Sequence, residues 1–230
     1  MNNNSIACEN VIKYYQTPAG VLKVLDGVNF TVLPNTVCAV SGESGCGKST
    51  LLNVICGLDH LTSGNIFLNN ENICGRSESE LAILRNCSVG FIFQTHNLLP
   101  EFTALENIIL PALVYAPVFS NKIKSIRTRA EELLDRVGLL SRKNHYIGEL
   151  SGGEMQRIAI ARALINKPNI ILADEPTGNL DEKNSAAVFN LLISIVRSEH
   201  CAMILVTHSK TLAQRCDRRF LLSNGVINSE

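Results

Sequence analysis

The chain has 230 residues, and its 21 lysine and arginine side chains are balanced by 21 aspartate and glutamate side chains. This length allows one large α/β domain with a well-buried core and an inserted lobe, but hardly two independent enzymes. The charge balance provides neither a basic field for nucleic acid nor an acidic tail for a cationic partner, so we expect no nucleic-acid partner.

Eight cysteines are scattered without a C-x-x-C pair, and several fall inside apolar strand or helix patterns. We interpret them as small buried hydrophobic side chains in a reducing cytosol. The first residues show no charged-then-apolar signal pattern, and no apolar run approaches the roughly 20 residues needed to cross a bilayer. We therefore expect any membrane role to come through a partner.

Two long edge strands are predicted at the start of the chain, over 6–15 and 21–33, because apolar side chains alternate there with polar or small ones. A short hairpin through 65–73 adds to this antiparallel flank. Tyr14 and Tyr15 lie near the first turn. Neighbouring side chains on a strand point to opposite faces, so only one of the two can stack on an adenine base. For Tyr14, a half-buried strand tyrosine is the alternative.

A glycine-rich stretch over 42–50 follows an apolar strand at 37–40 and precedes a helical run at 51–56. Its G-x-x-x-x-G-K-[ST] pattern lets successive backbone N–H groups turn onto phosphate oxygens at the positive end of the helix. Lys48 supplies charge to the outer phosphates, and the Ser49 hydroxyl reaches the Mg²⁺ that travels with them. The pattern predicts a P-loop nucleotide hydrolase. The predicted phosphate-binding residues are Gly42, Glu43, Ser44, Gly45, Cys46, Gly47, Lys48, Ser49 and Thr50.

The middle of the chain predicts a ligand-facing strand end followed by helices. A short apolar strand over 88–93 ends on Gln94, and ligands meet α/β sheets at the carboxyl ends of strands. A lone glutamine is weak by itself, because most are simply exposed. A capping box at 103–106 opens an apolar helix, and a second helical pattern covers 123–137. These helices form a lobe over 95–150.

Another capping box pairs Ser151 with Glu154 and opens an apolar helix that runs to Ile165. A helix start with Ser-Gly-Gly exposed at its tip is a second anion site. The alternative is an ordinary N-cap. Without the P-loop elsewhere in the chain, the anion site and the ordinary N-cap would have even odds. The residues of this predicted tip are Ser151, Gly152, Gly153 and Glu154.

Two further strand ends carry polar side chains. The buried strand over 170–173 ends in Asp174 and Glu175; since side chains alternate, one carboxylate faces Mg²⁺ and the other faces the water that attacks the γ-phosphate. The buried strand over 201–206 ends beside His208. A lone histidine is more often structural, but at this edge we favour a functional role. The remaining predicted elements are a helix at 182–199 and a hairpin at 220–227 that turns on Asn224-Gly225.

In this order the motifs resemble those of the ATP-binding cassette (ABC) ATPases over essentially the whole chain. The resemblance implies an α/β P-loop NTPase fold of the ABC type, with an antiparallel β flank and an inserted helical subdomain. It divides the single domain into a nucleotide-binding core at 1–94 and 151–230 and a helical subdomain at 95–150. The Lys-x-Tyr spacing makes Tyr15 similar to the adenine-stacking residue of the family.

The resemblance also implies residue roles and a mechanism. Glu175 would be the catalytic base, His208 the switch histidine and Lys48 the phosphate-binding lysine. Two cassettes would face head to tail, and the Ser151 helix tip of one would close on the γ-phosphate held by the other, so that two ATP molecules are sandwiched. Ligation of Mg²⁺ would fall to Ser49, Gln94 and Asp174. Further motifs are the Q-loop residue Gln94, the signature motif 150–154 and the D-loop 178–181.

Within the family, 91–107 and 172–181 are similar to the lipoprotein-releasing ATPases of the LolD type, whose near relatives are the MacB-type exporters and FtsE-type cell-division ATPases. That subgroup drives lipoproteins out of the bacterial inner membrane with integral-membrane permease partners of the LolC and LolE type. The implied location is the cytoplasmic face of the inner membrane, as a peripheral protein. We expect 103–115 to lie near the groove that receives the partner. Departures from the family pattern are Met155 after the signature, Ser209 after the switch histidine, and the turn at Asn69-Asn70, which lacks the usual glycine.

Two other functions fit the sequence less well. A cassette acting on nucleic acid or the ribosome would have a long coiled coil between P-loop and signature, or two cassettes in one chain, and this chain has neither. A non-enzymatic regulatory cassette would have lost Glu175 or Lys48, and both are present. The sequence therefore predicts an ATPase that converts ATP and water to ADP and phosphate.

Overall fold

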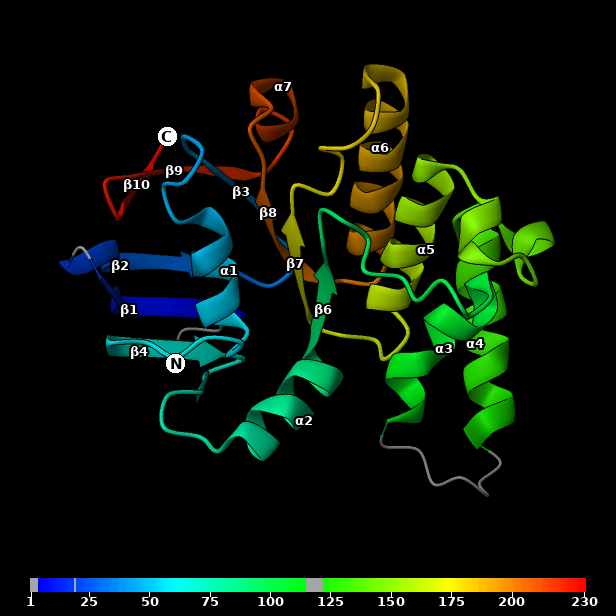
Figure 1. Cartoon of the computed structure of the whole chain (residues 1–230), viewed down its shortest axis with the longest axis horizontal. Helices are drawn as coiled ribbons and strands as arrows, with labels where there is room; N and C mark the ends of the chain where they lie inside the picture. The colour runs from blue at the N-terminus through cyan, green and yellow to red at the C-terminus, as the bar shows by residue number, and fades with distance from the viewer. Residues whose placement is uncertain (1–3, 19, 115–121) are drawn as a thin grey trace.

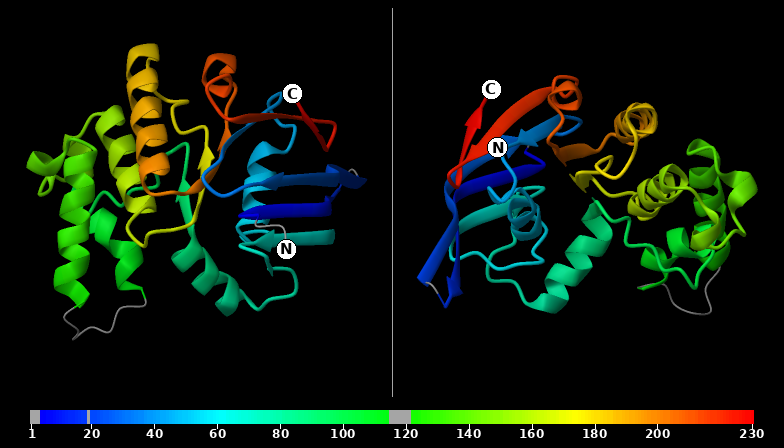
Figure 2. Two further views of the ribbon diagram at one scale, coloured as in Figure 1. Left: turned by 180° about the vertical axis from the view of Figure 1, so that it is seen from behind. Right: turned by 45° about the horizontal axis from the view of Figure 1, so that its top comes forward.

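A computed structural model describes residues 4–18, 20–114 and 122–230 and contains two β-sheets flanked by helices. One end of the molecule is formed by antiparallel strands and the other by a group of helices (Figures 1 and 2). The strands are β1 (Ile6–Thr17), β2 (Gly20–Val32), β3 (Val37–Ser41), β4 (Ser63–Leu68), β5 (Glu71–Asn72), β6 (Val89–Ile92), β7 (Ile170–Asp174), β8 (Ala202–Val206), β9 (Arg218–Ser223) and β10 (Val226–Ser229).

The four-stranded sheet has the order β2-β1-β4-β5 and is antiparallel, as predicted. The prediction of an edge strand is right for β2 but wrong for β1, which pairs with β2 on one side and with β4 on the other. Its turn between β4 and β5 is made by Asn69 and Asn70, both in the left-handed conformation (φ 50° and 67°). Asparagine tolerates this conformation better than most residues, so the turn closes without a glycine. The hairpin between β9 and β10 uses Asn224 and Gly225 in the same way (φ 50° and 76°).

The six-stranded sheet has the order β10-β9-β3-β8-β7-β6, and β9, β3, β8, β7 and β6 run parallel. The unbroken apolar runs of β3, β7 and β8 are buried on both faces, which is why they carry no alternation in sequence. In register, Val206 of β8 pairs with Val40 of β3 on one side and with Asp174 of β7 on the other. The carboxyl ends of the three strands therefore share one edge.

The helices begin at the capping signals in the sequence. Ser77, Thr103 and Ser151 each accept a hydrogen bond from the backbone N–H three residues on, and the glutamate carboxylate at that position accepts one from the backbone N–H of the cap. The helix capped by Ser77 was not predicted. The α-helices are α1 (Lys48–Ile55), α2 (Glu78–Ser88), α3 (Ala104–Leu113), α4 (Lys122–Arg136), α5 (Gly152–Ala163), α6 (Glu182–Ser198) and α7 (Lys210–Ala213), with 3₁₀ turns η1 (Leu140–Arg142) and η2 (Ile147–Glu149).

Two hydrophobic cores cover the two faces of the six-stranded sheet. In β8, Met203 and Leu205 face one core, and Ala202, Ile204 and Val206 face the other, which is the period of two expected for a strand. The lobe-side core joins α3, α4, α5 and α6 and includes Ile92, Ile108, Leu133, Leu134, Ile158, Phe189 and Leu192. The P-loop-side core surrounds α1 and includes Ile6, Leu25, Leu51, Leu52, Ile55, Ile66 and Leu68.

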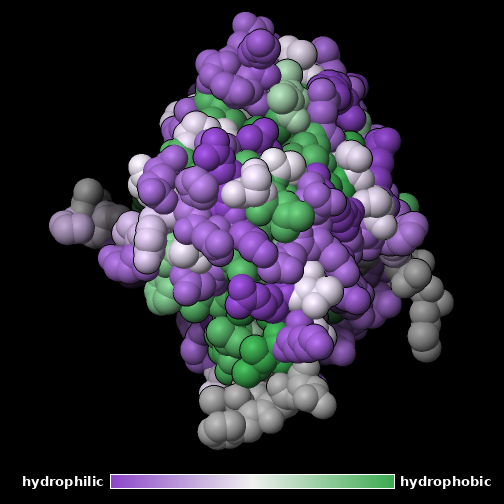
Figure 3. Space-filling model, turned by 90° about the vertical axis from the view of Figure 1, so that its right-hand side faces the viewer, coloured by the Kyte–Doolittle hydropathy of each residue, from purple (hydrophilic) through white to green (hydrophobic). Residues whose placement is uncertain are grey.

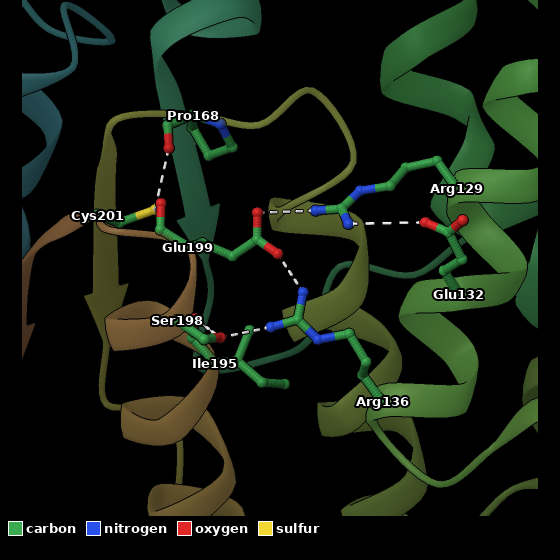
Figure 4. A network of polar contacts seen from close by, with 8 residues as sticks. All are labelled: Arg129, Glu132, Arg136, Pro168, Ile195, Ser198, Glu199 and Cys201. Atoms are coloured by element: carbon green, nitrogen blue, oxygen red, sulfur yellow. Dashed lines mark hydrogen bonds and ion pairs between the residues drawn. The ribbon is translucent and has the colours of Figure 1, made fainter.

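A network of ion pairs ties α4 to the end of α6 (Figure 4). Glu199, whose side chain is 16% exposed, accepts from Arg129 at 2.9 Å and also pairs with Arg136. Arg136 donates in addition to Ser198 Oγ at 2.6 Å. Burial opposes ionisation of Glu199, but the two guanidinium groups outweigh it and hold the pKa of this carboxyl below its usual range. The pairs join segments that are more than 60 residues apart in the chain.

Glu199→Gln is expected to lower the free energy of unfolding by about 1–2 kcal/mol at neutral pH, because two charge-assisted contacts lose their anion. Since the folded pKa is depressed, the wild-type advantage is complete above the unfolded pKa and is lost as pH falls through the lower folded pKa. Urea unfolding at several pH values measures this. The control is Glu132→Gln, an exposed carboxylate 3.9 Å from Arg129. Equal destabilisation by both variants would contradict the assignment.

Within the described ranges, no helix combines the length and the apolar character needed to span a lipid bilayer.

Candidate functional site

The P-loop connects β3 to α1 and is held closed by its own lysine. Lys48 is 6% exposed, and its Nζ donates to the carbonyl oxygens of Gly42 at 3.0 Å and Glu43 at 2.7 Å. Gly47 has a φ of 103°, and a Cβ at this position would come within 2.8 Å of Val24 Cγ1. Both the backbone angle and the space therefore require glycine. The loop presents backbone N–H groups at the start of α1, where an anion is favoured.

Asp174 is the last residue of β7, and Glu175 follows it outside the strand. Strand alternation was predicted to point the two carboxylates in different directions. In the structure, Glu175 lies outside the strand, so alternation does not set its direction. Glu175 has a φ of 44°, in the left-handed region, and its N–H donates to Val206 O at 3.0 Å. A non-glycine residue held in this conformation stores strain, which is common at active sites. The direction of the Glu175 side chain is thus fixed by a backbone turn.

His208 follows β8 and contacts Glu175 across the strand ends. Its Nε2 lies 2.6 Å from Glu175 Oε1, a hydrogen-bond distance when Nε2 carries the proton. The histidine side chain is 45% exposed and the glutamate 19%, so the pair is open to solvent from the histidine side. Ser209, the departure from the family pattern, caps α7 by accepting from the N–H of Leu212 at 3.3 Å. A serine therefore meets the capping need at this position.

Gln94 lies between β6 and the helices, next to the residues that follow β7. Its backbone carbonyl accepts a hydrogen bond from Asn179 Nδ2 at 3.0 Å. Its side-chain Nε2 and Glu175 Oε2 both approach Gly178, where a Cβ would lie 3.3 Å and 3.2 Å from them. The structure thus brings Gln94 to the same strand edge as Glu175.

The Ser151 tip of α5 is a regular helix start whose first residue lies at the surface. Ser151 is exposed, its hydroxyl accepts from the N–H of Glu154 at 3.3 Å, and Glu154 Oε2 accepts from the N–H of Ser151 at 2.9 Å. These hydrogen bonds hold the pKa of Glu154 below its usual range. A Cβ on Gly152 would meet only Leu180 Cδ2, at 3.6 Å. The tip has room for an anion that comes from outside.

Tyr15 is anchored beside the start of α1. Its hydroxyl donates to Asp59 Oδ2 at 2.6 Å, and Lys13 Nζ lies 4.5 Å from the ring centre and 2.6 Å from Asp59 Oδ1. Burial first, and then the hydrogen bond to Asp59, raise the pKa of Tyr15, whereas a contact with the Thr50 hydroxyl lowers it. Lys13 lies over one face of the ring, so a base would have to stack on the opposite face. Neither Asp59 nor Lys13 was predicted to take part.

The donor set at this edge fits a cation that arrives with a nucleotide. No group of three or more histidine, cysteine, aspartate or glutamate residues suited to a metal was found in the part of the chain that the structure describes. The Ser49 hydroxyl, the Gln94 amide and the Asp174 carboxylate are oxygen donors with a single negative charge. Mg²⁺ in nucleotide sites is held in this way, by one or two carboxylates together with phosphate oxygens.

Three comparisons with known proteins bear on these features. The family model described as ABC transporter matches residues 25–178. The chain is 43% identical over 222 residues to the lipoprotein-releasing system ATP-binding protein LolD of Blochmanniella floridana, covering 96% of this chain and 93% of the relative. It is 44% identical over 231 residues to the protein of the same name from Coxiella burnetii, covering 100% of this chain and 98% of the relative.

Solved structures show the same similarity. The dimeric post-hydrolysis state of the ATP-binding cassette MJ0796, bound to ADP and Pi, gives a TM-score of 0.88 at 36% identity and covers 98% of this chain and 97% of that chain. The cassette cbiO1 of Clostridium perfringens, part of the transporter complex cbiONQ, gives a TM-score of 0.86 at 26% identity and covers 99% of this chain and 88% of that chain.

Proposed function

Because this chain belongs to the ABC transporter family, we propose that it is the ATP-hydrolysing subunit of a membrane system that releases lipoproteins from the bacterial inner membrane. The chain is an ATPase of the cassette type, with the α/β fold predicted from its motifs. The observation that carries the lipoprotein-releasing role is the identity of 43–44% over nearly the full length to proteins of that name.

In the proposed reaction, the backbone N–H groups of 42–50 hold the phosphates of ATP and Lys48 neutralises the outer ones. Glu175 accepts a proton from the attacking water, and His208, 2.6 Å from that carboxylate, orients it and contacts the γ-phosphate. Tyr15 stacks on the adenine through its free face. Ser49, Gln94 and Asp174 would hold Mg²⁺, which when bound would neutralise phosphate charge.

We further propose that the site is completed by a second copy of the cassette. The MJ0796 structures are dimeric, and one of them holds ADP and Pi. The exposed Ser151 tip of α5 supports the same arrangement here, because the positive end of its helix dipole is open to an anion brought by another chain. Hydrolysis would remove the ligand that holds the two copies together, and they would part.

The permease partners, of the LolC and LolE type, are proposed to dock at a cavity of about 370 Å³ between α2, α3 and α5. The side of the molecule formed by the helical lobe is mostly hydrophilic and has a hydrophobic area near its lower end (Figure 3). Exposed apolar residues at the end of α3 and in α4 include Leu113, the following Val114, and Ile123. The cavity lining includes Arg85, Phe91, Phe93, Pro111, Val114 and Arg162.

The prediction that 103–115 lies at this groove needs a correction for its first half. Ala104, Leu105 and Ile108 are buried in the lobe-side core, because the apolar face of α3 packs against α4 and α5. Pro111 and Val114, at the other end of α3, line the cavity. Tyr115 lies outside the described residues. The docking role therefore narrows to the carboxyl-terminal end of α3.

The division into a core at 1–94 and 151–230 and a helical subdomain at 95–150 remains part of the proposal, as does the peripheral location on the cytoplasmic face of the inner membrane. The lobe-side core supports a close attachment between the two parts, because it contains buried residues of both.

The test is reconstitution with permease subunits of the LolC and LolE type in vesicles that carry a lipidated substrate protein. We expect the chain to co-purify with the permease and ATP to drive release of the lipoprotein to a soluble acceptor. Val114 lines the cavity and its neighbour Leu113 does not. Val114→Asp is therefore expected to weaken binding to the permease more than Leu113→Asp, which controls for the loss of an exposed apolar side chain. ATP hydrolysis with no lipoprotein release would indicate MacB-like export or an FtsE-like role instead.

A further inference from the structure

The D-loop residues Gly178 and Asn179 lie between Gln94 and Glu175, which belong to different parts of the proposed ATP site. Asn179 Nδ2 donates to the backbone carbonyl of Gln94 at 3.0 Å, across 85 residues of sequence. The N–H of Gly178 donates to Glu175 O at 2.9 Å. One short segment is therefore bonded to both neighbours.

The space around Gly178 is tight. It is not among the glycines with positive φ, so its backbone angles suit other residues as well. A Cβ, however, would come within 3.2 Å of Glu175 Oε2 and 3.3 Å of Gln94 Nε2. Contacts this short force neighbours to shift. The absence of a side chain thus allows the Gln94 amide and the Glu175 carboxylate to approach the same point from two sides.

The chain after Gln94 is held at one further position. His96 and Asn97 adopt left-handed conformations (φ 61° and 49°), and Arg162 donates to the carbonyl oxygens of both, at 2.7 Å for His96. Arg162 lies on α5 and therefore restrains the loop from the lobe side. Asn179 restrains it from the sheet side, at Gln94 itself.

We propose that Asn179 is a positioning residue for ATP hydrolysis, whose side-chain amide holds the Gln94 backbone so that the Gln94 amide stays beside the Glu175 carboxylate. Asn179 acts through Gln94 and does not touch the reacting atoms. The inference rests on the proposed function, because Gln94 and Glu175 matter here as parts of the ATP site.

The experiment measures kcat and KM for MgATP in Asn179→Ala and Asn179→Asp. Loss of one neutral hydrogen bond is expected to lower kcat about fivefold in Asn179→Ala, with KM changed less than about twofold. Asn179→Asp keeps the shape but has no donor for the Gln94 carbonyl, so its kcat falls at least as far. The matched control is Asn190→Ala. It removes an exposed asparagine of α6 that accepts a hydrogen bond from Arg215, and it is expected to keep the wild-type kcat.

A second measurement distinguishes positioning from a general structural role. In a Gln94→Ala background the Gln94 carbonyl remains but its side chain is gone, so adding Asn179→Ala is expected to cause no further loss of kcat. Independent losses that multiply would overturn the inference, as would a wild-type kcat in both Asn179 variants or an Asp variant equal to wild type. Absence of hydrolysis by the wild-type chain would instead refute the proposed function.

Discussion

Glu175→Gln is expected to reduce kcat for ATP hydrolysis by about 10²- to 10⁴-fold, because an amide cannot accept the proton of the attacking water. Glutamine has the same shape and can keep the contact with His208, and it adapts to the same left-handed backbone. Binding of MgATP should be as tight as in the wild type or tighter, since one negative charge near the phosphates is removed. The trapped nucleotide should make the dimer accumulate.

Phosphate release and size-exclusion chromatography with MgATP measure these effects. The control is Glu9→Gln, which removes an exposed carboxylate on β1 of the antiparallel sheet and should leave hydrolysis unchanged. Undiminished hydrolysis by Glu175→Gln would remove Glu175 from its proposed role. Failure of the variant to dimerise with ATP would contradict the two-cassette site.

Gly152→Asp and Lys48→Ala should both lower hydrolysis by at least about 10²-fold, but for different reasons. Lys48 belongs to the chain that holds the nucleotide, so its loss weakens nucleotide binding to the isolated chain. The Ser151 tip is proposed to act on the nucleotide of the partner copy. An aspartate there repels the γ-phosphate and prevents pairing, while binding of a fluorescent ATP analogue to the isolated chain stays at the wild-type value.

The fold should tolerate this substitution, because a Cβ on Gly152 meets only Leu180 at an ordinary contact distance and an acidic residue suits the first turn of a helix. Gly148→Asp is the matched control; it adds the same charge at an exposed glycine of η2 with open space around its Cβ. If Gly152→Asp weakens nucleotide binding to the isolated chain as much as Lys48→Ala does, the tip belongs to the site of its own chain.

Most of the fold could be predicted because its signals are local. The apolar runs before Asp174 and His208, the capping boxes at Thr103 and Ser151 and the Asn224-Gly225 turn each specify their element within a few residues. The helix α2 was missed although Ser77 and Glu80 form a capping box. Its apolar side is short, with only Leu81 and Leu84 buried, so the periodicity was weak.

The geometry of the site could be predicted only in part. The motifs predict Lys48 and Glu175 as site residues, but no local pattern shows that Asp59 holds the Tyr15 hydroxyl, since 44 residues separate them. The left-handed turn at Glu175 was invisible for a related reason. A strand pattern predicts the alternation of side chains along β7. The backbone angle at Glu175 instead depends on the hydrogen bond from its N–H to Val206 O on the neighbouring strand.

Helix α5 connects the proposed ATP site to the cavity proposed for the permease. It begins at the Ser151 tip and ends at Ala163, which lines the cavity proposed for the permease. A helix of twelve residues is about 18 Å long and nearly rigid, so a displacement of one end moves the other end as well. By thermodynamic linkage, the free energy by which closure of the two cassettes strengthens permease binding equals the free energy by which permease binding favours closure.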